Sequence, residues 1–321
     1  MGKRVKYPVP GTCPEYAKGE TMSAIFRTFF FLLLMVLQAH RAIAGTQSVT
    51  VDVGGQSVYV PAPAGFHEIS RLSPETRKLA ETFTPPDNRL LAVFVSESDL
   101  GRIMKGETPK AERYMFLQVY RRLENSGISG TQFSQLVGQV KQQQDTILEK
   151  AKDEVGPLVD KASGKFADDY GISLKLKIGD LVPLGFFMEK SDAAGFASFG
   201  KVQGDADGQQ LDSLLVSGIS YVRVKGKLLY AYVYGKYETP KDLDWVRTTS
   251  TNWVDQILAA NIGQGSSTKA DYRSTSASGF DWDKVFEKGI TAAIAGVFIG
   301  LIGVAIVATK RLFGKKKEHD Y

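Results

Sequence analysis

Few residues in the chain have the types and spacing that catalysis requires. The sequence of 321 residues contains three histidines, His40, His67 and His319, and a single cysteine, Cys13. His67 is the only histidine between the two terminal segments, so a serine–histidine–aspartate arrangement there would have one candidate base. A site built from several histidines is excluded for the same reason. The remaining catalytic hypothesis is a hydrolase of unrecognised type that uses carboxylates and His67.

Two groups of acidic residues resemble ligand sets without completing one. Gly204–Asp212 (GDADGQQLD) has carboxylates at alternate positions beside a glycine, as calcium loops do, but the glycine at the sixth position and the closing glutamate are absent. This composition favours a hairpin turn. Asp168–Asp169 and the pair Asp242 and Asp244 are typical of helix ends and first turns. The sequence predicts no metal site and no cofactor.

The longest apolar stretch lies near the C-terminus. Ile290–Thr309 (ITAAIAGVFIGLIGVAIVAT) has 20 residues and no charge, about the length that crosses roughly 30 Å of hydrocarbon as a helix. Within it, Ala292, Gly296 and Gly300 recur at steps of four, the small-residue spacing that lets two membrane helices approach closely. The pattern predicts one C-terminal transmembrane helix, and self-association through this face is a hypothesis.

A basic tail follows this stretch directly. Its five cationic residues are Lys310, Arg311, Lys315, Lys316 and Lys317. Because lysine and arginine beside a membrane helix keep that end in the cytoplasm, we expect residues 310–321 to be cytoplasmic. The cluster also suits anionic lipid headgroups, although setting the topology is the simpler role.

The N-terminus has the pattern of an export signal. Phe29–Leu37 (FFFLLLMVL) is apolar but too short to span a bilayer, and Ala42–Ala44 has the small residues of a cleavage site. A start at Met22 and cleavage after the last of these alanines make residues 1–44 the signal region. Residues 1–21 are then an upstream start-site artefact or an extended n-region. An uncleaved anchor over Phe29–Leu37 is the alternative.

The charge of the chain is concentrated at its ends. Residues 1–44 hold a formal charge of +4 and the tail +3, which leaves −2 for residues 45–309 out of the total of +5. A near-neutral domain lacks the basic face that neutralises phosphates, so nucleic acid is excluded as a partner. Because Cys13 precedes the predicted cleavage site, the mature chain has no disulfide or thiol chemistry and depends on its core for stability.

Residues 45–261 have the pattern of one exported domain. The first half alternates apolar and polar residues around Gly54–Gly55, which predicts a hairpin, and then shows a capped helix. We expect strands at Val49–Val53, Ser57–Pro61, Leu90–Val95 and Tyr114–Leu123, and a helix over Leu72–Phe83. In the second half we expect strands at Ser173–Ile178, Pro183–Glu189, Gly195–Phe199, Ser213–Tyr221, Val222–Val224 and Lys227–Tyr237, and a closing helix over Lys241–Ala260.

A long helical region separates the two halves. Apolar residues recur at steps of three and four from Thr131 onward, and Gly156–Pro157 is expected to break or kink the helix because proline lacks the amide donor. Gln142–Gln144 and the charges of Lys150–Glu154 indicate a solvated face, with a partner-binding helix as the alternative. Residues 262–289 follow the domain as a tether and juxtamembrane segment, because they begin rich in glycine and serine.

Three tyrosines stand on one face of the strand predicted near the end of the domain. Tyr230, Tyr232 and Tyr234 alternate with apolar residues at a period of two. Such an aromatic row is typical of packing within a sheet. A platform for a ligand is the alternative interpretation.

The order of these elements resembles a known fold. The strand end VYVPAPAGF, a central strand–helix segment and the closing unit GKLLYAYVYGKY–TPKDLDWV are similar to the PsbP-like fold of exported α/β/α sandwich proteins. The resemblance covers about Thr46–Asn261 in element order alone and gives no functional residue. It implies a binding or assembly module rather than an enzyme, and Thr131–Tyr170 is longer than that fold needs.

The sequence therefore predicts an α+β fold, an antiparallel sheet covered by helices, with one C-terminal transmembrane helix. We expect a single-pass protein of the bacterial cytoplasmic membrane, with its domain in the periplasm or outside and its C-terminus in the cytoplasm. The expected role is binding or scaffolding of an envelope protein partner beside the lipid bilayer. The alternatives are the hydrolase and a domain with a lipid or small-molecule pocket between sheet and helix.

Overall fold

The computed structural model of the chain describes residues 48–262, except 73, 83, 106, 108, 171–173 and 207–208, and residues 284–296 except 295. The predicted signal region 1–44, residues 263–283, Gly300 and the tail 310–321 lie outside the described residues. The strands are β1 (Val49–Val53), β2 (Gln56–Val60), β3 (Phe66–Glu68), β4 (Asn88–Ser96), β5 (Arg113–Tyr120), β6 (Leu174–Lys190), β7 (Ala193–Ala206), β8 (Gln209–Val224) and β9 (Lys227–Lys236). The helices are α2 (Pro74–Thr82), α3 (Glu97–Met104), α4 (Arg121–Glu124), α5 (Gly130–Tyr170) and α6 (Pro240–Ala260).

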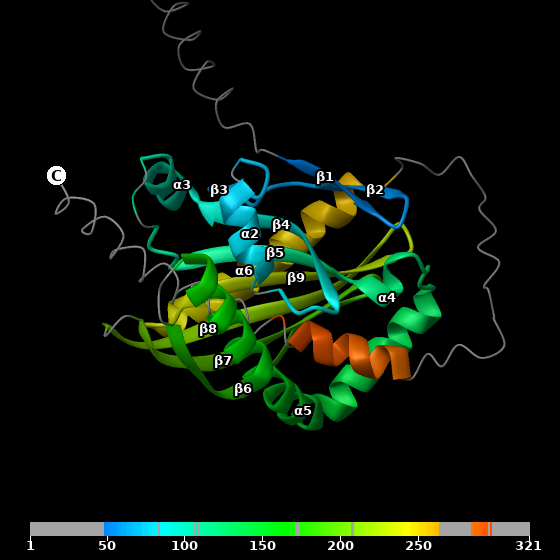
Figure 1. The fold of residues 1–321 in the computed structure, drawn as a ribbon. Helices are drawn as coiled ribbons and strands as arrows, with labels where there is room; N and C mark the ends of the chain where they lie inside the picture. The colour runs from blue at the N-terminus through cyan, green and yellow to red at the C-terminus, as the bar shows by residue number, and fades with distance from the viewer. Residues whose placement is uncertain are drawn as a thin grey trace, which may run out of the picture. The chain divides into compact units, whose positions relative to one another are not determined.

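An antiparallel sheet of seven strands organises the domain, in the order β3-β4-β5-β9-β8-β7-β6. β9 lies in the middle, and its first nine residues are all buried. Figure 1 shows helices on the sheet faces. The expectation of an α+β domain with an antiparallel sheet covered by helices is confirmed.

The hairpin β1–β2 forms a separate two-stranded sheet. Gly54 and Gly55 have φ of 55° and 79°, the left-handed conformation that a tight hairpin turn needs at both central positions. Val49, Val51 and Val53 are buried while the residues between them are exposed. One face of the hairpin thus joins the core, as the alternating sequence predicts.

α6 and the hairpin share one face of the large sheet. Trp253 of α6 is buried, meets Phe94 of β4 edge to face at 5.3 Å between ring centroids, and donates from Nε1 to the carbonyl oxygen of Pro61 at 2.9 Å. Gly218 of β8 allows the close approach, because a Cβ there would lie 2.6 Å from Oγ of Ser250. The apolar core of this side is therefore closed by α6 together with the hairpin.

The opposite face is covered by α5 and by the helical segment 284–296. Phe286, Ile290 and Ile294 of that segment are buried in one apolar cluster with Phe133 and Val140 of α5. Figure 1 shows the segment, in orange, beside α5. Burying each side chain of this size contributes roughly 1.5–3 kcal/mol, so the segment is an integral part of this face in the structure.

The sequence predicts neither β3 nor α3, and β8 is one strand where the sequence predicts two, Ser213–Tyr221 and Val222–Val224. Three further details differ from the sequence prediction. β5 ends at Tyr120, and Arg121–Glu124 forms α4 instead of continuing the predicted strand to Leu123. The β-like composition of that stretch gave no sign of the turn, which is held by the amide of Arg121 donating to the Asp87 carbonyl oxygen at 2.8 Å.

α5 continues through Pro157 instead of breaking there. Figure 1 shows the helix as two arms that meet at an angle. Proline removes one backbone hydrogen bond, and packing of the apolar face on both sides offsets that loss: Val155 and Val159, which flank Pro157, are both buried in the core. The sequence predicts a break or a kink at Gly156–Pro157. The helix does not break there, because packing of its apolar face outweighs the local penalty, and its two arms meet at an angle.

β6 is one long strand where the sequence predicts two. Its pairing with β7 shifts register between Ile178 and Leu181 and again beyond Pro183, so bulges replace the expected turn. Pro183 is tolerated because β6 is the edge strand of the sheet. β7 and β8 pair as a hairpin across the predicted turn region Gly204–Asp212, since Asp205 pairs with Gln210, while residues 207–208 lie outside the described part of the chain.

No helix within the described ranges is long and apolar enough to span a membrane. The segment 284–296 covers only the first part of the predicted span Ile290–Thr309, and its helix already begins at residue 284. Residues 297–309 lie outside the described part of the chain.

Candidate functional site: a tyrosine face that holds a helix

Tyr230, Tyr232 and Tyr234 project from β9 toward the segment 284–296. Each hydroxyl donates a hydrogen bond to a backbone carbonyl oxygen of that segment. Tyr230 contacts Gly289 at 3.0 Å, Tyr232 contacts Ala293 at 2.9 Å and Tyr234 contacts Gly296 at 2.9 Å. We call these three tyrosines, together with Asn88 and Gln118, the tyrosine face.

The spacing of the contacts follows from the two secondary structures. Tyrosines two positions apart on a strand lie on one side and rise about 6.6–6.8 Å per step. Residues 289, 293 and 296 are separated by steps of four and three, so their carbonyls lie on one side of a helix that rises about 5.4 Å per turn. Because these repeats are similar, a helix running in the same direction as β9 meets one hydroxyl after another.

Asn88 adds a fourth contact from the start of β4. Its Nδ2 donates to the carbonyl oxygen of Ala292 at 3.0 Å and to Oε1 of Gln118 on β5 at 2.9 Å. Both side chains are about 1% exposed. A buried amide nitrogen is costly unless it donates hydrogen bonds. The bond to Gln118 orients Asn88, which then donates to one more carbonyl of the helix.

The face also selects the side chains that it accepts. A Cβ added at Gly296 would lie 2.5 Å from the hydroxyl of Tyr232, and one at Gly289 would lie 3.1 Å from the hydroxyl of Tyr230. Ala292 and Ala293 are buried between these glycines. The four contacts are made to backbone carbonyls, so they do not depend on side-chain chemistry. They do depend on side-chain size, because only a helix with small residues at these positions can come close enough to make them.

Burial raises the pKa of all three tyrosines well above 10.0, and the neighbouring phenols add to the shift. The rings of Tyr232 and Tyr234 are stacked with 6.1 Å between their centroids, and Tyr234 stacks on Tyr114 at 4.9 Å. The hydroxyls therefore stay protonated at neutral pH, which is the state that donates to carbonyls. The aromatic packing expected from the sequence is present, and it also orients the donors.

Two of the small residues expected to pack membrane helices lie in this site. Ala292 and Gly296 meet the tyrosine face, whereas Gly300 and the basic residues Lys310, Arg311, Lys315, Lys316 and Lys317 lie outside the described part of the chain. The sequence showed both the tyrosine row and the small-residue row, but no local pattern joins elements 50 or more residues apart. Asn88 and Gln118 carried no signal at all.

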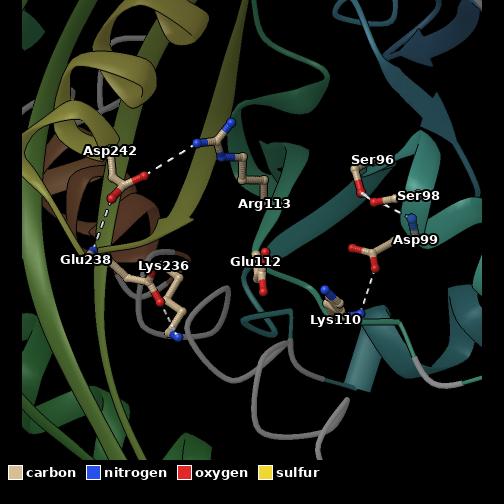
Figure 2. A pocket seen from close by; sticks show the side chains of 9 residues that line it. All are labelled: Ser96, Ser98, Asp99, Lys110, Glu112, Arg113, Lys236, Glu238 and Asp242. Carbon is tan, nitrogen blue, oxygen red and sulfur yellow. Dashed lines mark hydrogen bonds and ion pairs between the residues drawn. The ribbon is translucent and has the colours of Figure 1, made fainter.

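Apart from the tyrosine face, a hollow of about 330 Å³ lies where β4, β5 and β9 meet the start of α6. Figure 2 shows its charged lining. Arg113 pairs with Asp242 at 3.4 Å and Lys236 with Glu238 at 2.6 Å, while Asp99 accepts from the backbone amide of Lys110 at 2.6 Å. Arg113 and Lys236 are thus each paired with an acidic side chain of the same hollow.

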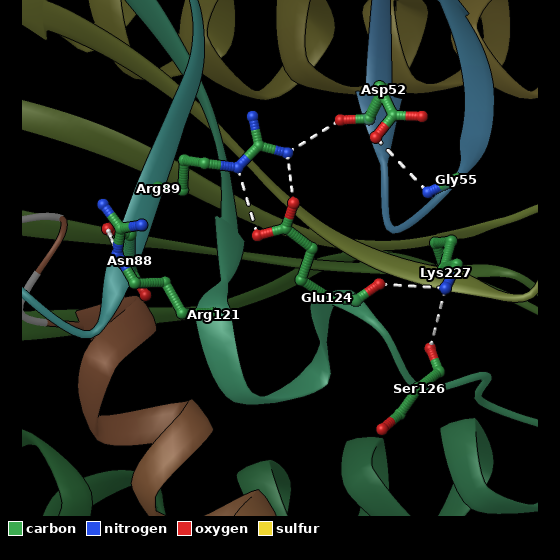
Figure 3. A network of polar contacts seen from close by, with 8 residues as sticks. All are labelled: Asp52, Gly55, Asn88, Arg89, Arg121, Glu124, Ser126 and Lys227. Carbon is green, nitrogen blue, oxygen red and sulfur yellow. Dashed lines mark hydrogen bonds and ion pairs between the residues drawn. The ribbon is translucent and has the colours of Figure 1, made fainter.

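A polar network ties the hairpin to the large sheet (Figure 3). Arg89 forms two hydrogen bonds with the carboxylate of Glu124, at 2.5 and 3.1 Å, and donates to the carbonyl oxygen of Asp52 at 2.7 Å. Lys227 is 2% exposed and donates to the carbonyl oxygens of Glu124 and Ser126. Burial lowers the pKa of Lys227, with Asp52 and Glu124 opposing the shift. This lysine holds a loop in place.

The residues of the hydrolase hypothesis are not brought together. His67 is half-buried on β3, and within the described ranges no carboxylate forms an ion pair with it. The buried carboxylate of Glu68 accepts from the backbone amide and hydroxyl of Ser70. The described residues also contain no group of three metal-ligating side chains.

Comparison with known proteins adds no family to this geometry. The chain matches none of the known protein-family models, and curated proteins give no match either. The fold and the site define an antiparallel α+β domain in which one face of the sheet holds a helix of the same chain.

Proposed function

We propose that the protein is a membrane-anchored binding or scaffolding protein of the bacterial envelope, with no catalytic role. Its tyrosine face binds a membrane helix that carries small residues at the contact positions. The single observation behind this proposal is the row of four donors, Tyr230, Tyr232, Tyr234 and Asn88, hydrogen-bonded to buried backbone carbonyls on one side of one helix.

The chemistry of the face supports a helix as the ligand. The three tyrosine hydroxyls and Nδ2 of Asn88 are hydrogen-bond donors set in an apolar wall, and they are spaced to match helical carbonyls rather than a compact headgroup or a metal. A helix is also the form in which a membrane protein hides its backbone from lipid. A partner helix that has just left, or is about to enter, the bilayer would meet this face from the side of the membrane.

The position of the domain supports the same proposal. The export signal and the span Ile290–Thr309 predict a domain tethered at the outer surface of the cytoplasmic membrane, with its basic tail inside. That geometry places the tyrosine face within reach of other membrane helices. Self-association through Gly296 and Gly300 would make a second copy one such partner.

Photocrosslinking from the face tests the proposal. The photoreactive amino acid p-benzoylphenylalanine replaces Tyr232 in the full chain, expressed at native level in bacterial membranes. We expect an adduct to a second polypeptide whose crosslinked peptide, identified by mass spectrometry, is a transmembrane helix with small residues four apart. The matched control places the same group at Tyr59, a half-exposed position on β2.

Adducts at position 232 that remain within one chain, or that equal those at position 59, would overturn the proposal. A soluble ligand crosslinked at position 232 would overturn it as well. A positive result requires the partner peptide to be mapped, because capture of an unidentified protein does not identify a helix.

A further inference from the structure

The helix that occupies the tyrosine face overlaps with the predicted membrane span. Residues 290–296 belong to both, since the docked segment is 284–296 and the span is Ile290–Thr309. In the docked arrangement, Ile290, Ala293 and Ile294 are completely buried in protein. They cannot face lipid at the same time.

The remainder of the span is too short to cross a bilayer by itself. Residues 297–309 number 13, and 13 helical residues rise about 20 Å against roughly 30 Å of hydrocarbon. The span cannot be lengthened toward the N-terminus beyond Gly289, because Lys288 and Glu287 come next. Lys310 and Arg311 close the other end. Docking and full insertion are therefore mutually exclusive.

We infer that the C-terminal helix exchanges between two states, docked on the tyrosine face of its own chain and inserted in the membrane. The docked state shields the apolar segment from water when the chain is away from a bilayer. Insertion withdraws residues 284–296 and uncovers the tyrosine face for the partner helix. This inference rests on the proposed anchoring, and it makes anchoring the condition for partner binding.

The contacts of the docked segment suit such an exchange. The four hydrogen bonds to its backbone each contribute only a modest net free energy. Three of them are donated by uncharged phenols, so no charge is left unpaired when the helix leaves. Gly289 and Gly296 contribute no side chain to the core, so the side chains that leave it are Phe286, Ile290, Ala292, Ala293 and Ile294. The bilayer offers Ile290 and Ile294 an equally apolar environment.

Gly296 distinguishes the two states experimentally. A side chain there would collide with Tyr232, because the Cβ alone would lie 2.5 Å from the hydroxyl. The same side chain makes the span more apolar, which favours the bilayer. Gly300 provides the matched control: it is the next glycine of the same span, and leucine there adds equal apolarity.

The test is flotation of the purified full chain, kept free of detergent, with vesicles of phosphatidylethanolamine and phosphatidylglycerol. Native protein is compared with Gly296→Leu, with Gly300→Leu and with the triple variant Tyr230→Phe, Tyr232→Phe and Tyr234→Phe. One typical hydrogen bond contributes a factor of about five to an equilibrium. We therefore expect the ratio of membrane-bound to free chain to rise by that factor for each hydroxyl removed, and the three factors multiply in the triple variant. Gly296→Leu should increase binding well beyond Gly300→Leu.

Equal increases for the two glycine variants would overturn the inference, because the apolarity of the span alone would then decide binding. Unchanged binding of the triple variant would overturn it too. The triple variant adds no bulk, so it keeps the test valid if Gly296→Leu fails to fold, and near-ultraviolet circular dichroism checks both. No partner is present in this assay, so its outcome is independent of the crosslinking result.

Discussion

At the scale of single residues, the buried ionisable groups of this domain act on the backbone rather than on a ligand. Glu68 holds the amide of Ser70, Asp99 holds the amides of Lys110 and Ala111, and Lys227 holds two carbonyls. Each satisfies a main-chain group that an apolar residue would leave unpaired. These side chains therefore have a structural role in the described part of the chain.

Asp242 allows a prediction about acid stability. Its carboxylate accepts from the amides of Thr239 and Glu238 at the start of α6, and these bonds, with a smaller contribution from Arg113, lower its pKa from 3.8. A lowered folded-state pKa contributes stability that is present above pH 3.8 and is lost as the pH falls through the folded value. We expect Asp242→Asn to cost about 0.5–1 kcal/mol at neutral pH, since the carboxylate remains partly exposed, with 18% of its side-chain surface accessible.

Urea unfolding at neutral pH and at strongly acidic pH measures this effect. The difference between native protein and Asp242→Asn should shrink as the pH falls. Asp244→Asn, an exposed change in the same turn of α6, is the control and should leave the free energy of unfolding unchanged. A constant difference at every pH would show that the carboxylate charge is not the cause.

At the scale of elements, the sequence predicts individual helices and strands well, but it predicts poorly which of them pack against one another. The hairpin around Gly54–Gly55, the β9 strand and α6 follow from period-two alternation, turn residues and capping, all of which are local. The continuation of α5 through Pro157 and the bulged course of β6 depend on what packs against them. The candidate site could not be predicted from the sequence for the same reason. Tyr232 and Ala293 are far apart in the chain and come into contact only in the folded structure.

The tyrosine row of β9 gives this scale its own prediction, an alkaline release of the helix. Burial raises the pKa of Tyr230, Tyr232 and Tyr234 above the ordinary value of 10.0. Groups with a raised folded-state pKa contribute stability that is complete below pH 10.0 and is lost as the pH rises further. Phenolate also cannot donate to a carbonyl, so docking and stability should fail together.

Hydrogen exchange is too fast to follow at such pH, so thermal unfolding and tyrosine absorbance in an alkaline pH series are the measurements. The native melting temperature should fall steeply above pH 10.0, and the triple phenylalanine variant should fall less. Tyr59→Phe on the hairpin is the control. Lys227 acts in the opposite direction because burial lowers its pKa, but one lysine cannot offset three tyrosines. Equal slopes for all three proteins would contradict the prediction.

At the scale of the whole molecule, charge and apolarity divide the chain into parts for which we predict different surroundings. The domain and span together carry −2, while the signal region and tail carry +4 and +3. The basic ends have the distribution expected of segments that stay on, or start from, the cytoplasmic side. The domain, free of cysteine after Cys13, is suited to either redox environment because its two cores need no disulfide.

This division predicts a definite topology for the inserted state. With an epitope tag placed after Tyr321, protease added to spheroplasts should digest the domain and leave the tag attached to a short protected fragment that contains Ile290–Thr309. Detergent should expose the tag, and N-terminal sequencing of the mature chain should begin at Gly45. Replacing Lys310, Arg311, Lys315, Lys316 and Lys317 together with glutamine should weaken this orientation, since they supply the positive charge beside the helix. A tag digested in intact spheroplasts would place the tail outside, and the tyrosine face could then not meet partner helices in the proposed geometry.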